Sequence, residues 1–433
     1  MPREFTDIST MLQSAQETLT DELIDSLAFT AQFGHSETLR LRAQDMIVQL
    51  AQDHGIYCAS LFDLYKARAH STWSSFSVPA CNIRTLTYHT SCVFHEAIIK
   101  HSMGPVVFEI ALSEQEYTSQ THREYASAIL AGALKAGYIG PIFLLGDHYQ
   151  VRSEAFRADK ESEVKRLEEC IRSALSAQFY SIDIDGSTVV NLELPDEKDQ
   201  QKDNYEITAH LTKKIRAWQP ADVTVAIGGE IGHIGGVNST EADFEAFMDG
   251  FSRIYTDTNT GLSKIALQTG TSHGGTPLQD GTIKEVAVDT SLHQKIGSRA
   301  REKYELGGTV QHGASTLPDD MFHLFPDTGT LEVHLSTGWQ NTVYDALPSS
   351  LRENMYAWIK SECAKEHKPD MTMEQFIYKS RKKAFGPFKR ELWHLPEAEL
   401  EPILSTLSAH FVRVATQLNI CNQRHVIDSI YTK

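Results

Sequence analysis

The sequence predicts an α/β protein, a (β/α)8 TIM barrel with an N-terminal helical extension and a C-terminal helical segment. Short apolar or β-branched runs recur eight times, and most neighbouring runs are separated by a segment with helical periodicity. Eight strands fit a closed barrel, whereas a doubly wound sheet usually has about five to seven. The runs cover residues 76–81, 105–111, 141–146, 180–184, 222–228, 264–269, 308–311 and 331–335.

Helical patterns flank these runs, so we expect three parts: residues 1–75, a barrel over 76–345, and a helical segment over 346–433 that packs on it. In the first part, Leu23, Ile24, Leu27 and Ala28 recur at helical spacing. The last part ends in an amphipathic helix whose apolar face holds Leu400, Ile403, Leu407, Phe411 and Val414.

Composition limits the possible partners. The chain has 433 residues and a net charge of −17, which argues against general binding to nucleic acid or an anionic membrane. No apolar run approaches the roughly 18 residues of a membrane span, and no apolar signal segment follows Met1. We therefore expect a soluble, cytoplasmic protein with neither nucleic-acid nor membrane partners.

The six cysteines are scattered without a C-x-x-C pair, which is typical of reduced thiols rather than a disulfide framework or a cysteine-based zinc site. Any metal ion must therefore be held by histidines and carboxylates.

The third run, Pro141 to Gly146, is apolar without polar alternation and is followed by Asp147 and His148. Such a run indicates a strand covered on both faces, which carries its polar residues at its end. Asp147-His148 would then lie where barrels place their chemistry. The alternative is a helix-capping aspartate beside a structural histidine.

Polar residues also follow the later runs, and in a barrel all these strand ends open onto one face. His148, His273 and His312 would therefore meet there, and three imidazoles completed by a carboxylate or by substrate suit Zn²⁺ or a similar divalent ion. The strand-end groups are Asp147-His148, Asp185-Gly-Ser187, Gly229-Glu230, His273-Gly274, His312-Gly313-Ala-Ser315 and Ser336-Thr337.

The loops after the last two strands have the chemistry of a phosphate site. Barrels often bind phosphate there through glycine amides, hydroxyls and a helix N-terminus. Gly313, Ser315, Ser336 and Thr337 supply such groups. Helix capping explains the same residues, since the stretch from Ser315 to Asp320 looks like a helix start, and the two interpretations are compatible.

From about residue 76 to 425 the chain resembles the class II, metal-dependent ketose-bisphosphate aldolases, of which fructose-bisphosphate aldolase is the best known. Six motifs in the family's order and spacing carry the resemblance: Pro79-Ala-Cys-Asn82-Ile, Asp147-His148, Ile184-Asp185-Gly-Ser, Glu230-Ile-Gly-His-Ile-Gly-Gly236, Gly270-Thr-Ser-His273-Gly and His312-Gly-Ala-Ser315.

The resemblance implies a zinc-dependent aldolase that reversibly cleaves a phosphorylated ketose, similar to fructose or tagatose 1,6-bisphosphate, to dihydroxyacetone phosphate and an aldehyde. It implies that His148, His273 and His312 hold zinc, that Asp147 transfers a proton, and that the enzyme is a homodimer or higher oligomer. The other implied roles are Asp185 and Glu230 as ligands of a second or displaced metal ion, Asn82 facing the substrate, and Gly274, Gly313, Ser315 and Thr337 around the phosphate and a monovalent cation, Na⁺ or K⁺.

The chain departs from the family around the substrate. Val237-Asn238 replaces acidic residues, Thr276-Pro277 replaces a lysine, Ala111 replaces a serine, and His334-Leu-Ser336-Thr337 replaces Asn-x-Asp-Thr. We interpret His334 as a substrate donor, although it could also lie near the metal or simply end a strand. The alternatives to an aldolase are a metal-binding barrel that has lost catalysis and a metal-dependent hydrolase.

A basic stretch at residues 379–390 stands out in this acidic chain. Its simplest interpretation is a solvated linker between two helices. By resemblance, such a segment can instead bring an arginine towards the phosphate site of a neighbouring subunit.

Overall fold

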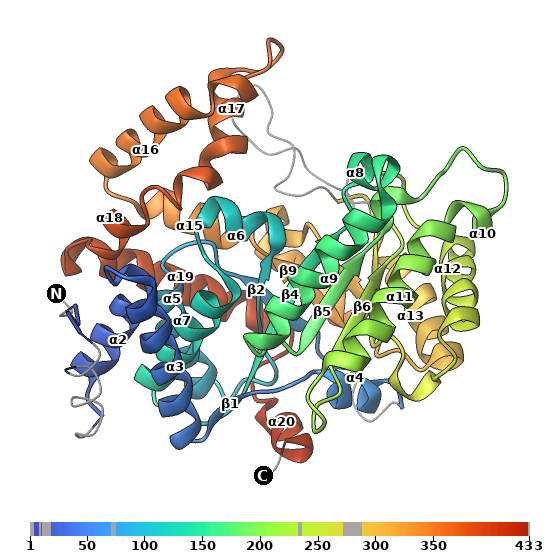
Figure 1. The fold of residues 1–433 in the computed structure, drawn as a ribbon, viewed down its shortest axis with the longest axis horizontal. Coiled ribbons are helices and arrows are strands. Elements are labelled where there is room, and N and C mark those ends of the chain that lie inside the picture. The colour runs from blue at the N-terminus through green and yellow to red at the C-terminus, as the bar shows by residue number, and fades with distance from the viewer. Residues whose placement is uncertain are drawn as a thin grey trace.

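The computed structural model describes residues 4–7, 10, 19–70, 75–232, 236–271 and 288–431. Eight parallel strands form a closed barrel in which each strand pairs with the next and the last pairs with the first, which confirms the predicted fold (Figure 1). The strands are β2 (Val78–Asn82), β3 (Val107–Ala111), β4 (Gly140–Gln150), β5 (Ser181–Asp185), β6 (Ala226–Glu230), β7 (Lys264–Leu267), β8 (Thr309–Gln311) and β9 (Glu332–Leu335).

Helices connect the strands and surround the barrel, and their apolar faces form the outer core. In α9, for example, Leu167, Ile171 and Leu175 are buried, as their spacing predicts. The main connecting helices are α5 (Thr87–Lys100), α7 (His122–Lys135), α9 (Lys160–Ser176), α11 (Lys202–Trp218), α12 (Glu241–Ile254), α13 (Thr290–Tyr304) and α15 (Thr337–Ala346). Shorter elements are α6 (Leu112–Thr118), α8 (Ser153–Ala158), α10 (Glu197–Gln200), α14 (Leu324–Asp327) and the 3₁₀ turns η1 (Ser187–Val189), η2 (Thr258–Thr260), η3 (Ala314–Thr316) and η4 (Asp319–His323).

The N-terminal part is helical, as predicted, and includes one strand that the sequence pattern does not predict. Its elements are α2 (Asp21–Phe33), α3 (Glu37–Asp53), β1 (Ile56–Cys58) and α4 (Phe62–Ala69). Strand β1 pairs with residues 140–142 at the start of β4, outside the ring of eight. Helices α2 and α3 pack against α7, so this part lies on the outer layer of the barrel.

The C-terminal part is helical too, and α19 contains the predicted closing amphipathic helix, with Ile403, Leu407, Phe411 and Val414 buried. The elements are α16 (Ser349–Glu362), η5 (Ala364–Glu366), α17 (Met373–Ser380), η6 (Arg381–Ala384), α18 (Lys389–Trp393), α19 (Glu397–Gln417) and α20 (Arg424–Ile430). Among the described residues, no helix is both long enough and apolar enough to cross a membrane. Division of the chain into domains at residues 75 and 345 stays a prediction.

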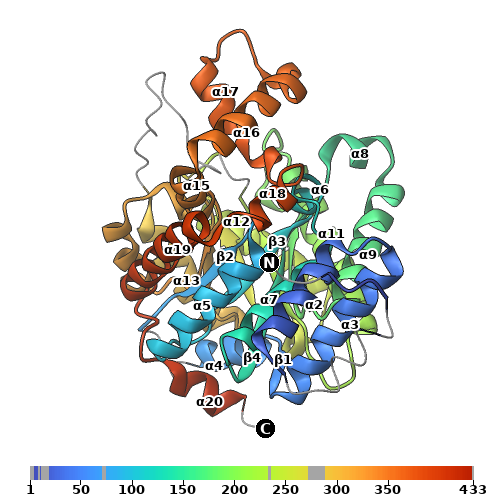
Figure 2. The ribbon, with the colours of Figure 1, turned by 90° about the vertical axis from the view of Figure 1, so that its left-hand side faces the viewer.

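The basic stretch is packed against the protein's own barrel, so its interpretation as a solvated linker is wrong. Arg381 is buried, and the Gly386 amide donates to the Tyr117 carbonyl at 3.1 Å. Lys389 Nζ donates to the Ser119 carbonyl at 2.8 Å. These contacts hold the stretch on α6, and α16 and α17 stand above the barrel end at which the strands finish (Figures 1 and 2).

The barrel interior holds a buried ion-pair cluster towards its other end. Lys264 is 1% exposed, lies 2.9 Å from Asp183 Oδ2, and also pairs with Glu332, which accepts a hydrogen bond from Tyr65. Burial opposes a charge on Lys264, but Asp183 and Glu332 raise its pKa above the usual value. The lysine therefore stays a cation and compensates the two carboxylates.

Replacing Lys264 with methionine should destabilise the fold, because it leaves two buried carboxylates without their cation. We expect a loss of about 3–5 kcal/mol in the free energy of unfolding, measured by urea titration. The matched control is Lys160→Met, since Lys160 pairs with Asp203 at the exposed surface and should change stability by at most about 1 kcal/mol. Equal stability of the two variants would contradict a compensating role for Lys264.

Candidate metal centre

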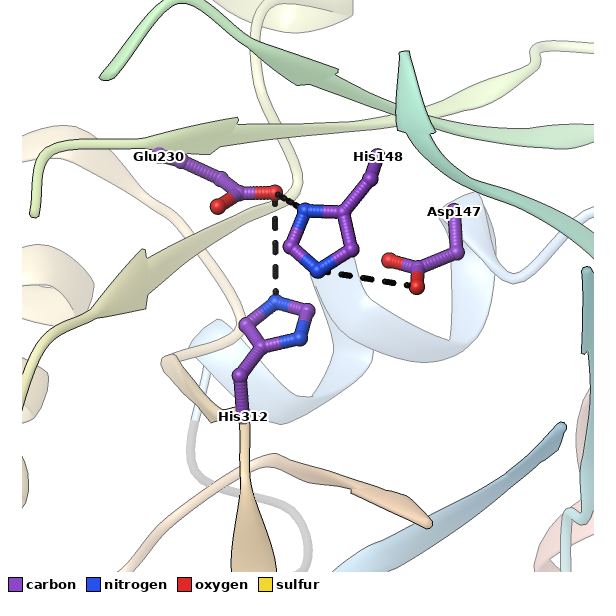
Figure 3. Close-up of side chains that lie close together, drawn as sticks. All are labelled: Asp147, His148, Glu230 and His312. Carbon is purple, nitrogen blue, oxygen red and sulfur yellow. Dashed lines mark ion pairs between the residues drawn. The ribbon is translucent and has the colours of Figure 1, made fainter. Parts of the chain in front are cut away.

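Strand β4 does not end at Gly146, as the sequence pattern predicts, but runs on to Gln150 through a bulge. Gly146 pairs with Ile182 and Tyr149 pairs with Ile184, so Asp147 and His148 of β4 stand opposite Asp183 alone. His148 takes the left-handed conformation, with φ of 43°. In a regular strand, successive side chains point to opposite faces. The extra residue breaks that alternation, and both Asp147 and His148 reach the barrel mouth (Figure 3).

Four side chains from three strand ends converge there (Figure 3). His148 lies between two carboxylates: its Nδ1 is 2.9 Å from Glu230 Oε1, and its Nε2 is 3.7 Å from Asp147 Oδ2. His312 Nε2 lies 3.9 Å from Glu230 Oε1, and the His148 and His312 ring centroids are 4.5 Å apart. The structure therefore brings together Asp147, His148, Glu230 and His312 from the predicted site.

Neighbouring loops fix the orientation of these groups. Thr271 Oγ1 donates to the His312 carbonyl at 2.7 Å, which holds the backbone just after β8. Asp185, at the end of β5, accepts from the Ser187 amide at 3.0 Å, and its Oδ2 lies 3.3 Å from His148 Nδ1. Asp185 thus joins the cluster as a further carboxylate beside His148.

Burial and crowding shift the pKa values of the cluster. Burial, with Asp185 as the next cause, raises the pKa of Glu230 to about 8. Burial opposes a charge on His148, but Asp147 and Glu230 raise its pKa well above the usual range. Burial would raise the pKa of Asp147 as well, yet His148 and His334 hold it well below its usual range. Protons and a metal ion therefore compete for the same donors.

The donor set fits a divalent metal ion. One ligand atom from each of Asp147, His148, Glu230 and His312 lies within 4.8 Å of all the others. Glu230 Oε1 is buried between two imidazoles, and within the described part of the chain it makes no hydrogen bond of acceptable geometry. Nitrogen and oxygen donors that converge in this way suit Zn²⁺ and similar ions.

His273 and Gly274, which were predicted at the same centre, lie outside the described residues, as does Thr276-Pro277. Two of the three predicted histidine ligands are therefore brought together. The metal-binding role of all three stays a prediction.

The two predicted phosphate loops lie against each other, since the Ser336 amide donates to Ser315 Oγ at 2.8 Å. Gly313 adopts φ of 70°, a conformation that favours glycine, and Thr337 begins α15. The predicted helix start at Ser315 is instead a pair of 3₁₀ turns, η3 and η4. A phosphate-binding role for these loops stays a prediction.

Asn82 and a neighbouring cavity lie at two different places around the barrel mouth. Asn82, at the end of β2, is buried and donates to Glu114 on α6. A cavity of about 670 Å³ opens beside the ends of β5 and β6, and its lining includes Ser187, Val237 and Asn238. The positions at which the chain lacks the family's acidic residues therefore line a cavity next to the cluster.

His334 is buried among carboxylates rather than exposed at the mouth. Its Nδ1 is 2.7 Å from Glu109 Oε2, and its Nε2 is 2.7 Å from Glu332 Oε1. Glu109, Asp183, Lys264 and Glu332 were not predicted as members of the site. A charged residue inside an otherwise apolar strand run is the signal that could have found them. A substrate role for His334 stays a prediction.

The chain matches a known protein family. The family model described as fructose-bisphosphate aldolase class-II matches residues 63–386, most of the chain. The chain belongs to the class II fructose-bisphosphate aldolase family. A comparison with curated protein sequences found no significant match.

Solved structures show the same fold at low identity. A probable tagatose 6-phosphate kinase from Sinorhizobium meliloti 1021 is 14% identical, with a TM-score of 0.56, over 81% of this chain and 100% of that one. A fructuronate-tagaturonate epimerase from Cohnella laeviribosi is 12% identical, with a TM-score of 0.54, over 89% and 84%. A fructose-bisphosphate aldolase from Campylobacter jejuni is 16% identical, with a TM-score of 0.51, over 84% and 94%.

Class II aldolases are typically metal-dependent, so family membership agrees with the donor set at the mouth of this barrel. It supports an aldolase-type enzyme that acts on a phosphorylated ketose. The substrate and the metal belong to the proposal below.

Replacing Gly146 with alanine should weaken metal binding, because a Cβ there would overlap the ring of Tyr149 and displace the bulge. We expect at least about a tenfold loss in Zn²⁺ affinity, or about 1.4 kcal/mol, measured by competition with a chelator. The control is Gly297→Ala in α13, where the nearest atom to a new Cβ is the flexible end of Arg301 at 3.3 Å. Unchanged affinity in Gly146→Ala would show that the bulge does not position the ligands.

Proposed function

We propose that this protein is a zinc-dependent aldolase that reversibly cleaves a phosphorylated ketose to dihydroxyacetone phosphate and an aldehyde. The observation that carries the proposal is the convergence of His148, His312 and Glu230 at the barrel mouth, beside Asp147. Membership of the class II family supports the same reaction.

His148, His312 and Glu230 would hold the ion, with His273 as the further ligand implied by resemblance and Asp185 close by. When bound, a divalent ion supplies Lewis-acid stabilisation of the charge that develops as the bond beside the ketone breaks. The protein's part is to fix these donors on the ends of rigid strands, so that their geometry does not depend on mobile loops.

Asp147 is the proton-transfer group of the proposal. In cleavage, its carboxylate takes the proton of the hydroxyl on the carbon that becomes the aldehyde, and the electrons of the adjacent C–C bond pass to the ketone fragment. Asp147 Oδ2 lies 3.7 Å from His148 Nε2, at the rim of the donor set. Asp147 is next in sequence to His148, so it lies at the edge of the cluster.

The substrate of the proposal is similar to fructose or tagatose 1,6-bisphosphate. Gly313, Ser315, Ser336 and Thr337 would receive a phosphate at the N-terminal end of α15, with Gly274 and a monovalent cation beside it. Asn82 and His334 complete the proposed substrate residues. We further propose a cytoplasmic homodimer or higher oligomer.

Replacing Asp147 with asparagine should remove cleavage while leaving the ion held by His148, His312 and Glu230 in place. We expect cleavage of fructose or tagatose 1,6-bisphosphate to fall by about 100- to 10,000-fold, because the amide cannot take the hydroxyl proton. Exchange of a C–H proton of dihydroxyacetone phosphate should fall much less, since that step does not involve this hydroxyl. Asp203→Asn, a change at the exposed surface of α11, serves as the control.

The same two assays separate the alternatives. A chelator should abolish both activities and Zn²⁺ should restore them, whereas His312→Ala should lose metal and both activities. Wild-type cleavage by metal-free protein, or by Asp147→Asn, would refute the proposal. Ligand binding with neither cleavage nor exchange would indicate a binding protein that has lost catalysis.

A further inference from the structure

A second cluster of metal-type donors lies directly behind the first. Glu109 on β3, Asp147 on β4 and His334 on β9 are at most 5% exposed. His334 Nδ1 is 2.7 Å from Glu109 Oε2 and 3.5 Å from Asp147 Oδ1. These three atoms all lie within 4.8 Å of one another, so one nitrogen and two oxygens converge on a small buried space.

The three donor atoms of this cluster lie close together without forming well-aligned hydrogen bonds. Among the described residues, His334 Nδ1, Glu109 Oε2 and Asp147 Oδ1 are buried and make no hydrogen bond of acceptable geometry. Buried polar atoms are normally hydrogen-bonded. A cation in the space between the three atoms would satisfy all of them.

The second ring nitrogen of His334, Nε2, is hydrogen-bonded to a carboxylate, as is usual for a histidine that binds a metal ion. Its Nε2 is hydrogen-bonded to Glu332 Oε1 at 2.7 Å. Glu332 also accepts from Lys264 and Tyr65, which fixes it as an ionised acceptor. With the hydrogen on Nε2, the Nδ1 lone pair faces Glu109 and Asp147. A carboxylate that accepts from the outer nitrogen is the common partner of a ligating histidine.

We propose that Glu109, Asp147 Oδ1 and His334 hold a second divalent cation, which lies beside the first metal centre. The two carboxylate oxygens of Asp147 approach different histidines: Oδ2 lies 3.7 Å from His148 Nε2, and Oδ1 lies 3.5 Å from His334 Nδ1. One nitrogen and two oxygen donors suit Zn²⁺ or Mn²⁺.

This inference rests on the proposed function for the identity of the first centre, and it gives His334 a different role from that of substrate donor. The second ion compensates Glu109 and Asp147 and fixes one oxygen of Asp147. The other oxygen is then held towards the substrate for proton transfer. The competing arrangement is a protonated His334 that pairs with the same carboxylates and excludes any ion.

The test is the zinc content of the full-length holoprotein, measured by mass spectrometry after dialysis against a weak chelator. We expect two zinc ions per chain in the wild type, and one in both Glu109→Gln and His334→Asn. His312→Ala should lose the ion of the first centre instead. Glu163→Gln is the matched control: Glu163 is equally buried but pairs with Arg152 and Arg166, so this variant should keep both ions. Circular dichroism checks that each variant is folded.

One zinc ion in the wild type, unchanged in Glu109→Gln and His334→Asn, would overturn the second site and favour the protonated histidine. Because the wild-type count is decisive by itself, the result stands even where a variant does not fold. Ketose-phosphate cleavage by a protein with one ion would keep the proposed function and reject the second site. Two ions per chain without ketose-phosphate cleavage would keep the second site and reject the proposed function.

Discussion

The arrangement of this site depends on one extra residue in β4. Asp147 and His148 are adjacent, and regular pleating would send one of them away from the barrel mouth. The bulge and the left-handed backbone at His148 bring both to the same place. Gly146 makes this possible, because the ring of Tyr149 occupies the space that a side chain there would need. The contacts that Asp147 makes with His148 and with His334 start from this bulge.

The interior of the barrel is organised around the charge of these groups. A continuous set of buried ionisable side chains extends from Glu230 at the mouth, through Asp147 and His334, to Glu332 and Lys264 deeper in the barrel. Such a set is costly unless each charge is compensated. Deeper in the barrel, Lys264 compensates the charges of Asp183 and Glu332. At the mouth, among the described residues, Asp147, Asp185 and Glu230 gather around His148, and buried carboxylates are normally paired or coordinate metals.

The sequence predicted the fold well, because eight apolar runs and the helices between them follow from periodicity alone. Strand-end position also identified His148, Glu230 and His312, since parallel strands finish on one face. It could not predict the bulge, which depends on how Tyr149 packs against Gly146. Nor did it predict Glu109 or its contact with His334, because the two residues are distant in the chain and meet across β2, which lies between β3 and β9. Strand β1 was too short for its pattern to be distinctive.

The most direct measurement is the position of zinc in a crystal of the holoprotein, found by anomalous scattering at the zinc absorption edge. The account predicts a peak at the barrel mouth about 2.0–2.1 Å from a ring nitrogen of His148 and from one of His312. A zinc peak that contacts only one of these histidines, or neither, would contradict it.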